Sequence, residues 1–189
     1  MEFDEVVKQR RSARGFTKKR ANWKDVMYAI DSAIQGPFAG NHNNLKFLIV
    51  EEPGMIRTIA AFCEQHWIDS ASTIVLVCSD ETNLENIYGE RGRVYSRQQA
   101  GAAIQTLLLK LADLGLGSCW VGAYNDEMLR AKLNIPLNIL IEAVVPVGYA
   151  IGGEKKEKKA LENVLYWEKW GDGKRPSIFQ ESKEDPMPG

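Results

Sequence analysis

The sequence predicts a layered α/β or α+β protein with one main domain. Helical segments with an apolar face alternate along most of the chain with short apolar segments of strand length. The 189 residues suffice for one domain with a well-buried core, whereas two domains would each be small. The hydrophobic fraction of 44% and the charged fraction of 26% are those of an ordinary globular protein, so disorder and fibrous repeats are excluded.

The first half of the chain predicts three helices and two strands. A short helix begins near Phe3, and a second follows the N-cap residue Asn22 and stops near Pro37. We expect the apolar face of this second helix to consist of Val26, Met27, Ile30 and Ile34. A buried strand is predicted at 46–52, a helix opening at Pro53 and Gly54, and a core strand at 73–78.

The second half predicts one dominant helix and two further strands. The polar segment 80–95 is expected to be a mobile excursion, and the strongly apolar segment 97–114 to be the central helix. Gly115 and Gly117 end that helix. We then expect a strand at 118–124, a short helix at 128–133 and a long strand at 139–148.

The end of the chain has a different composition from the rest. We place the main domain at residues 1–160 and a C-terminal extension with a polar tail at residues 161–189. The extension carries an aromatic cluster, Tyr166, Trp167 and Trp170, which requires a surface to bury against. That surface belongs either to the same chain or to a partner subunit, and we favour the partner.

Charge and cysteine usage narrow the function classes. A net charge of −1 gives no overall positive field, so neither nucleic acid nor an anionic membrane is an expected partner. Three widely spaced cysteines argue against a disulfide framework and against a metal cluster, and we expect a reducing compartment. Without a secretion signal or a membrane-spanning apolar run, we expect a cytoplasmic protein.

The sequence contains few side chains that could bind a metal or act as a nucleophile. Only His42 and His66 are present, so a histidine-rich metal site is excluded, and neither residue stands in a recognisable hydrolase triad. Cys119 lies in an apolar segment next to Trp120, where a cysteine is more often a buried small side chain than a nucleophile. We therefore predict no metal site and assign no catalytic role to Cys119.

Two segments could bind a small molecule. Arg10, Arg11, Ser12 and Arg14 place three guanidinium groups and a hydroxyl within five residues, a pattern suited to phosphate, although a solvated basic helix end explains it as well. The small-residue loop Gly36–Asn41 would let the backbone approach a flat ligand, although an ordinary turn would have the same composition. Gly115–Gly122 lacks the spacing of a dinucleotide or nucleotide phosphate loop.

Together, five segments in this order resemble the nitroreductase family of FMN-dependent oxidoreductases. The resemblance spans about Arg10 to Trp167 and depends on the order and spacing of the segments. They are Arg10-Arg11-Ser12-Ala13-Arg14 with Phe16, Gly36-Pro37-Phe38-Ala39-Gly40-Asn41 before Phe47, Gln65-His66-Trp67-Ile68 before Ala71, Leu114 to Gly122, and Val145-Pro146-Val147-Gly148-Tyr149.

The resemblance implies a central mixed β-sheet flanked by helices, and an intertwined homodimer with FMN sites at the subunit interface. It places Arg10, Arg11, Ser12 and Arg14 on the FMN phosphate and pyrimidine edge of one subunit, and Pro37, Phe38, Ala39 and Asn41 on the FMN from the partner subunit. It further implies backbone of Val121 and Gly122 near flavin N5 and O4, Gln65 near the polar edge of the flavin, and Lys156 and Lys158 at the phosphate.

The implied activity is electron transfer from NADH or NADPH through FMN to a small-molecule acceptor, such as a nitro compound or a quinone, by a ping-pong mechanism. The alternatives are a flavin-binding module without turnover and a specialised relative, namely a dehalogenase, a flavin-destroying enzyme or a dehydrogenase. Family members commonly have Ser where Phe38 stands and Gln-Pro-Trp where Asn43-Asn44-Leu45 stands. These departures bear on the acceptor and partner contacts more than on FMN binding.

Overall fold

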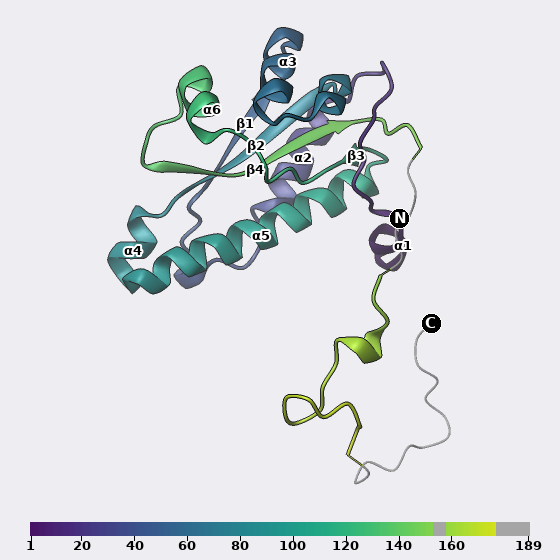
Figure 1. Ribbon diagram of the computed structural model, residues 1–189, viewed down its shortest axis with the longest axis vertical. Coiled ribbons are helices and arrows are strands. Elements are labelled where there is room, and N and C mark those ends of the chain that lie inside the picture. The colour runs from purple at the N-terminus through teal and green to yellow at the C-terminus, as the bar shows by residue number, and fades with distance from the viewer. Residues whose placement is uncertain (153–157, 177–189) are drawn as a thin grey trace. The chain divides into compact units, whose positions relative to one another are not determined.

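The computed structural model of the chain describes residues 1–152 and 158–176. The chain divides into two units, Met1–Gly153 and Glu154–Gly189. The first unit is a three-layer α+β fold with a four-stranded sheet between two groups of helices, which confirms the predicted fold class (Figure 1).

The sheet has the strand order β1-β2-β4-β3. Its strands are β1 (Leu45–Val50), β2 (Thr73–Asp80), β3 (Gly117–Ser118) and β4 (Ile139–Gly148), and their ladders are antiparallel. Outside these ladders, Ser12 and Ser118 form an isolated parallel bridge. The register of β2 on β4 shifts between Val77 and Cys78, which marks a β-bulge opposite Glu142.

One face of the sheet packs against α2 (Trp23–Ala33) and α5 (Glu90–Asp113). Asn22 caps α2 as predicted, because its side-chain oxygen accepts a hydrogen bond from the main-chain N–H of Lys24. Alternate strand residues form the sheet side of this layer, namely Val75, Val77, Ala143, Val145 and Val147. The short α1 (Phe3–Gln9) contacts α5.

The opposite face is covered by α3 (Pro53–Phe62) and α6 (Asp126–Leu133), together with the 3-10 turn η2 (His66–Ser70) (Figure 1). Glu52 caps α3, and Pro53 occupies its first turn, where a missing N–H costs nothing. The sheet contributes Ile74, Leu76, Cys78, Ile141 and Val144 to this layer. Because of the bulge, Ile141 and Val144 share a face although they are three positions apart.

The prediction for residues 80–95 was wrong. This segment forms α4 (Thr82–Tyr88) and the first turns of α5, and Gly89 separates the two helices. Leu84 is fully buried, and Arg93 of α5 binds Glu85 of α4 at 2.5 Å. The polar residues therefore cover the outside of a helix pair that a single buried leucine fixes to the core.

Two further expectations need correction. The strand expected at 118–124 is limited to Gly117–Ser118, after which Val121 makes only an isolated bridge to Val144. The buried face of α2 consists of the small residues Val26, Ala29 and Ala33, and Met27 is 48% exposed. Small side chains on this face let α2 pack closely on α5.

Within the second unit, residues 158–176 contain a short 3-10 turn, η3 (Leu161–Asn163). The rings of Tyr166 and Trp170 lie 5.0 Å apart, and Trp170 remains 92% exposed.

Candidate functional site

The arginine segment is extended chain attached to the sheet, and the interpretation of it as a helix end was wrong. Helix α1 ends at Gln9, and the backbone of Arg10 leaves the helical region. Ala13 then donates its main-chain N–H to the carbonyl oxygen of Ser118 in β3 at 2.9 Å. The segment Arg10–Arg14 therefore lies along the β3 edge of the sheet.

Residues just beyond the arginines secure this position against the end of β4. The main-chain N–H of Thr17 donates to the carbonyl oxygen of Tyr149 at 2.8 Å, and that of Ile151 donates to the carbonyl oxygen of Gly15 at 2.9 Å. Phe16 is buried and bridges to Ala150. Two segments that are far apart in the sequence thus hold the arginines in one place.

An open cleft of about 340 Å³ lies beside this segment. Its lining combines the cationic segment with the glycine-rich end of α5 and the residues after β4: Gln9, Arg10, Arg11, Ser12, Ala13, Ala112, Gly115, Leu116, Gly117, Ser118, Ala150 and Gly152. No Asp or Glu is among these residues. Charge of one sign in a concave site favours an anionic ligand.

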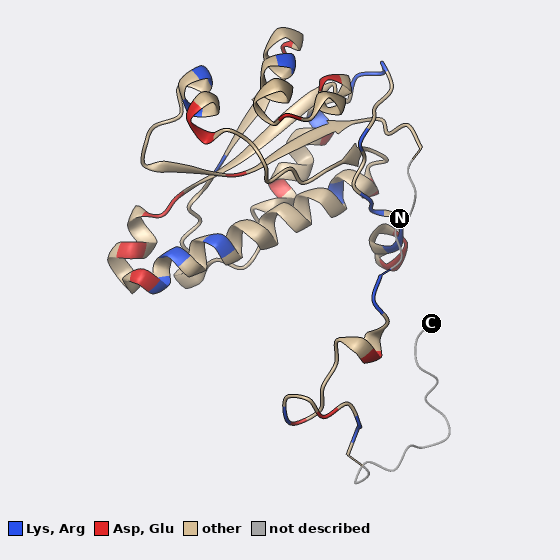
Figure 2. Cartoon of the chain, viewed as in Figure 1, with Lys and Arg blue, Asp and Glu red and all other residues tan. Residues whose placement is uncertain are grey.

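The sequence on both sides of the arginine segment is also positively charged. Residues 6–24 include eight Lys and Arg residues and no Asp or Glu, and Figure 2 shows this basic stretch along the segment that follows α1. Arg10 is half-buried, and Arg14 is exposed. Partial burial strengthens the interaction of a guanidinium group with a bound anion, because less water screens the charge.

Cys119 lies next to the same cluster. Burial raises the pKa of its thiol, and this effect exceeds the opposing influence of Arg14, a hydrogen bond with Ser12 and the charge of Arg10. The thiol is therefore protonated at neutral pH and is no nucleophile. The three opposing groups show that Arg10, Ser12 and Arg14 all lie within electrostatic reach of one buried atom.

The loop Pro37–Asn41 lies elsewhere on the same chain. It contains the 3-10 turn η1 (Ala39–Asn41), in which Gly40 and Asn41 both have left-handed backbone angles. With α5 it lines a cleft of about 230 Å³, formed by Pro37, Ala39, Tyr95, Gln98, Gln99 and Ala102. The arginine segment and this loop thus line different clefts of the single chain.

Gln65 is linked to the arginine segment through Trp67. The indole Nε1 of Trp67 donates to the side-chain oxygen of Gln65 at 3.2 Å, and the ring of Trp67 lies 6.5 Å from that of Phe16. The hydroxyl of Ser70 accepts the main-chain N–H of Phe16 at 3.1 Å. Gln65 and the arginines therefore belong to neighbouring parts of one packed region.

Val121 and Gly122 differ in what their backbone can offer a ligand. Both main-chain groups of Val121 are bonded to Val144, at 2.9 and 3.0 Å. Gly122 is exposed, and a Cβ added to it would meet no atom within 4 Å. Among the two predicted flavin neighbours, Gly122 is the one with open space beside it.

The structure does not test the two predicted lysines. Lys156 lies outside the described residues, and Lys158 is an exposed residue of the second unit. Within the described ranges 1–152 and 158–176, no three or more His, Cys, Asp or Glu side chains are grouped to hold a metal ion. In the same ranges, no helix is long and apolar enough to cross a bilayer.

Comparison with known proteins decides the family. Residues 52–149 match the model of the nitroreductase family, and these residues include β2, the central helix α5 and the long strand β4. The chain is 30% identical over 149 residues to a protein of Archaeoglobus fulgidus named as an NADH dehydrogenase/NAD(P)H nitroreductase, covering 76% of this chain and 83% of that protein. The chain belongs to the nitroreductase family.

One further relative and one solved structure are similar to the chain. An iodotyrosine deiodinase of Thermotoga neapolitana is 26% identical over 161 residues, which cover 77% of this chain and 87% of that protein. The solved structure of an FMN-dependent nitroreductase from Clostridium difficile R20291 superposes with a TM-score of 0.75 at 16% identity, covering 87% of this chain and 98% of that one. As a nitroreductase family member, the chain is an oxidoreductase.

Three further residues of the two clefts were not predicted as site residues from the sequence. Gly117 and Ser118 line the arginine cleft beside Ser12 and Ala13, and Gln99 binds the loop that follows Pro37. Ser118 gives no local signal, because its contact joins distant segments. Gln99 does give one, since it lies on the same face of α5 as the buried residues Ser96 and Ala103, where a polar side chain requires partners.

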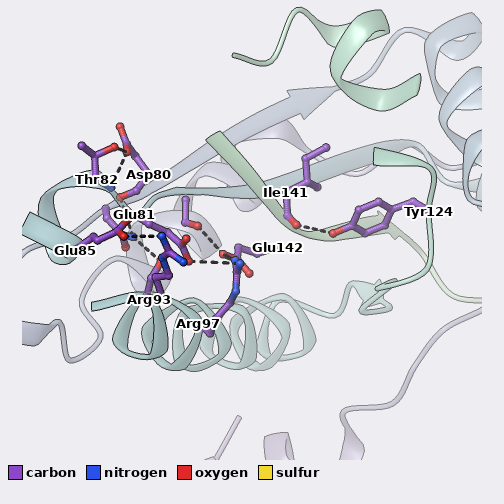
Figure 3. A network of polar contacts seen from close by, with 12 residues as sticks. Asp80, Glu81, Thr82, Glu85, Arg93, Arg97, Tyr124, Ile141 and Glu142 are labelled. Atoms are coloured by element: carbon purple, nitrogen blue, oxygen red, sulfur yellow. Dashed lines mark hydrogen bonds and ion pairs between the residues drawn. The ribbon is translucent and has the colours of Figure 1, made fainter. Parts of the chain in front are cut away.

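A polar cluster joins the exposed Arg97 of α5 to the sheet (Figure 3). Arg97 binds Glu142 at 2.5 Å and Glu81 at 3.4 Å, and the hydroxyl of the fully buried Ser79 donates to Glu142 at 2.5 Å. Glu142 is the residue at the β-bulge of β4. This cluster ties α5 to the sheet and has no residue in common with the arginine cleft.

Proposed function

We propose that the protein is an FMN-dependent oxidoreductase that takes electrons from NADH or NADPH and passes them to a small-molecule acceptor, such as a nitro compound or a quinone. Donor and acceptor bind in turn at the same face of the flavin, in a ping-pong sequence. Family membership supports the reaction class. The observation that carries the cofactor assignment is the cationic cleft of Arg10, Arg11 and Ser12 at the β3 edge.

The cleft fits the phosphate end of FMN in charge and shape. A phosphomonoester carries close to two negative charges at neutral pH, and guanidinium groups can bind its oxygens in pairs. Gly115 also lines the cleft, and a Cβ added there would meet no atom within 4 Å, so the backbone at this position leaves room for close approach of a ligand. The volume of about 340 Å³ is at the lower end of the range for small-molecule sites, so it accommodates part of the cofactor.

We assign a role at the flavin to each of these site residues. Arg10, Arg11 and Ser12 hold the phosphate, and Arg14 stabilises negative charge on the pyrimidine edge of the ring. Bound FMN would supply the two-electron chemistry. Gly122 donates its main-chain N–H near N5 and O4, while Val121 shapes the backbone there, because its own groups are bonded to Val144. Gln65 borders the polar edge of the flavin.

The remaining cofactor contacts come from a second copy of the chain. Pro37 and Ala39 line a cleft other than the arginine cleft, and we propose that they reach the FMN of a partner subunit in a homodimer, together with Phe38 and Asn41 of the same loop. Lys156 and Lys158 complete the phosphate site in this arrangement.

The cofactor assignment is tested by the absorbance of the purified protein and by titration of the protein with FMN. We expect flavin bands, or uptake of added FMN with quenching of its fluorescence. Anaerobic addition of NADH and of NADPH should bleach these bands, and a quinone or nitro acceptor should restore them. A colourless protein that takes up no FMN would overturn the proposal, and bound FMN without turnover would favour a module that only binds flavin.

One observation favours a second candidate, reductive dehalogenation. The relative from Thermotoga neapolitana is named as an iodotyrosine deiodinase. In such a reaction two electrons and a proton replace a carbon–halogen bond by a carbon–hydrogen bond, and halide leaves. Halide release from an iodinated phenol at a rate above that of quinone reduction would support this candidate, and absence of release would exclude it.

A further inference from the structure

A single buried side chain of α5 binds the loop that the proposed function places on the flavin. Gln99 is only 4% exposed. Its side-chain oxygen accepts the main-chain N–H of Ala39 at 3.1 Å, and its side-chain nitrogen donates to the carbonyl oxygen of His42 at 3.1 Å and to the side-chain oxygen of Asn44. All three hydrogen bonds go to residues 39–44.

The orientation of the amide is fixed by its backbone partners. Ala39 offers an N–H and therefore requires the oxygen of Gln99, whereas the carbonyl of His42 requires the nitrogen. Neither Asp nor Glu, with two oxygens when ionised, could serve both partners. Asparagine has the right groups but a shorter side chain.

Asn44 extends this arrangement into the core. Its side-chain nitrogen donates to the hydroxyl of Ser96 at 2.8 Å and to the carbonyl oxygen of Asp80 at 3.1 Å. Ser96 is fully buried one turn before Gln99 on α5. The loop is thus anchored to α5 and to the end of β2 by amide groups that water does not reach, and buried hydrogen bonds of this kind allow few alternative arrangements.

We propose that Gln99 is a positioning residue of the cofactor site: it fixes residues 37–44 in the shape in which Pro37–Asn41 contact the flavin. This inference rests on the proposed function. The loop contains two left-handed residues, Gly40 and Asn41, and at Asn41, which has a side chain, such backbone costs free energy that surrounding contacts must offset. Gln99 supplies contacts on both sides of this pair, at Ala39 and at His42.

The test substitutes Gln99→Met, which preserves length and volume but removes all three hydrogen bonds. Gln105→Met is the matched control, because Gln105 is an exposed residue of the same helix. We expect faster hydrogen–deuterium exchange in peptides covering residues 36–44 for Gln99→Met alone, together with an increase of about tenfold in the dissociation constant of FMN, a loss of about 1.4 kcal/mol. Gln99→Glu keeps the acceptor for Ala39 but sets a second oxygen against the acceptor oxygens of His42 and Asn44, so it should change both measurements at least as much as Gln99→Met.

The outcomes separate this inference from the proposed function. Exchange in residues 36–44 equal to that of the control would show that Gln99 does not hold the loop. Faster exchange with unchanged FMN affinity would reduce Gln99 to a structural role and overturn the inference, with the proposed function intact. If the wild-type protein binds no FMN, the proposed function fails, and the exchange data alone then decide whether Gln99 holds the loop.

Discussion

The main-chain N–H of Ala13 lies 2.9 Å from the carbonyl oxygen of Ser118, and this hydrogen bond attaches the arginine segment to the β3 edge. Close approach of the two segments depends on Gly117. A Cβ at this position would lie 2.6 Å from the Cβ of Ala150 and 3.1 Å from that of Ala13. Both neighbouring atoms are attached directly to the backbone, so a larger residue cannot be accommodated by side-chain rotation.

We therefore predict that Gly117→Ala lowers the free energy of unfolding by about 1–3 kcal/mol, as other overpacked sites do. It should also weaken FMN binding, because the arginine segment is displaced. Urea unfolding measures the first effect and FMN titration the second. Gly15→Ala is the control for stability, since a Cβ there meets nothing within 4 Å. Equal stability of the two variants would contradict the predicted clash.

Removal of one guanidinium group tests the phosphate site. We expect Arg11→Ala to weaken FMN binding by about 2 kcal/mol, or about thirtyfold, because a charge-assisted hydrogen bond is lost. Fluorescence titration with FMN gives the dissociation constant. Arg91→Ala removes the same charge from α5, where Arg91 lies 5.8 Å from the ring of Tyr95, and should leave FMN affinity unchanged. Unchanged affinity in Arg11→Ala would refute the assignment.

The stability that Glu52 contributes at the start of α3 is expected to depend on pH. The carboxylate of Glu52 accepts the main-chain N–H groups of Gly54 and Met55 at 2.7 and 2.5 Å, and these bonds hold its pKa below the ordinary value. A lowered pKa in the folded state means that Glu52 stabilises the protein above the ordinary carboxyl range. This stabilisation is lost as the pH falls through the folded-state pKa.

Glu52→Gln should accordingly melt a few degrees below wild type at pH 7, and the difference should shrink as the pH falls below about 4. Thermal unfolding at a series of pH values measures this difference. A difference independent of pH would show that the carboxylate charge contributes nothing at this cap.

The C-terminal extension provides a test of the dimer. Leu161, Val164 and Trp170 are exposed within the second unit, and such apolar groups require a partner surface. We predict that a chain ending before Leu161 dimerises more weakly than the full chain, as measured by light scattering across a dilution series. A chain ending at residue 176 retains the cluster and serves as the control. A tight dimer in the shorter chain would exclude the extension from the interface.

Elements dominated by local pattern could be predicted from the sequence. The strand β4 has the predicted bounds 139–148, because its apolar run is continuous, and Asn22 caps α2 because capping involves neighbouring residues. The positive charge of the arginine segment is also evident from the sequence. Its extended conformation did not follow from the sequence, because it depends on hydrogen bonds to Ser118 and Tyr149 far along the chain.

The helix pair at 82–113 has a polar composition in its first turns, which does not predict a packed helix pair. Only Leu84 and Gly92 of its first turns are buried, too few for a recognisable apolar period, and ion pairs such as Arg93–Glu85 account for the polar surface. The signal that was available is Gly92. A glycine on the buried face of a helix permits close approach of another backbone, here that of α4.

Gly92→Ala tests this account. An added Cβ would lie 2.2 Å from the carbonyl oxygen of Leu84 and 2.7 Å from the main-chain N of Glu85, which are backbone atoms and cannot rotate away. In a solvent-exposed helix, a Gly→Ala substitution raises the free energy of unfolding by up to about 1 kcal/mol. A decrease for Gly92→Ala would therefore indicate the clash with α4. We expect a loss of about 1–3 kcal/mol in urea unfolding and faster hydrogen exchange in residues 82–92. If the variant is more stable than wild type, α4 does not pack on α5 as described.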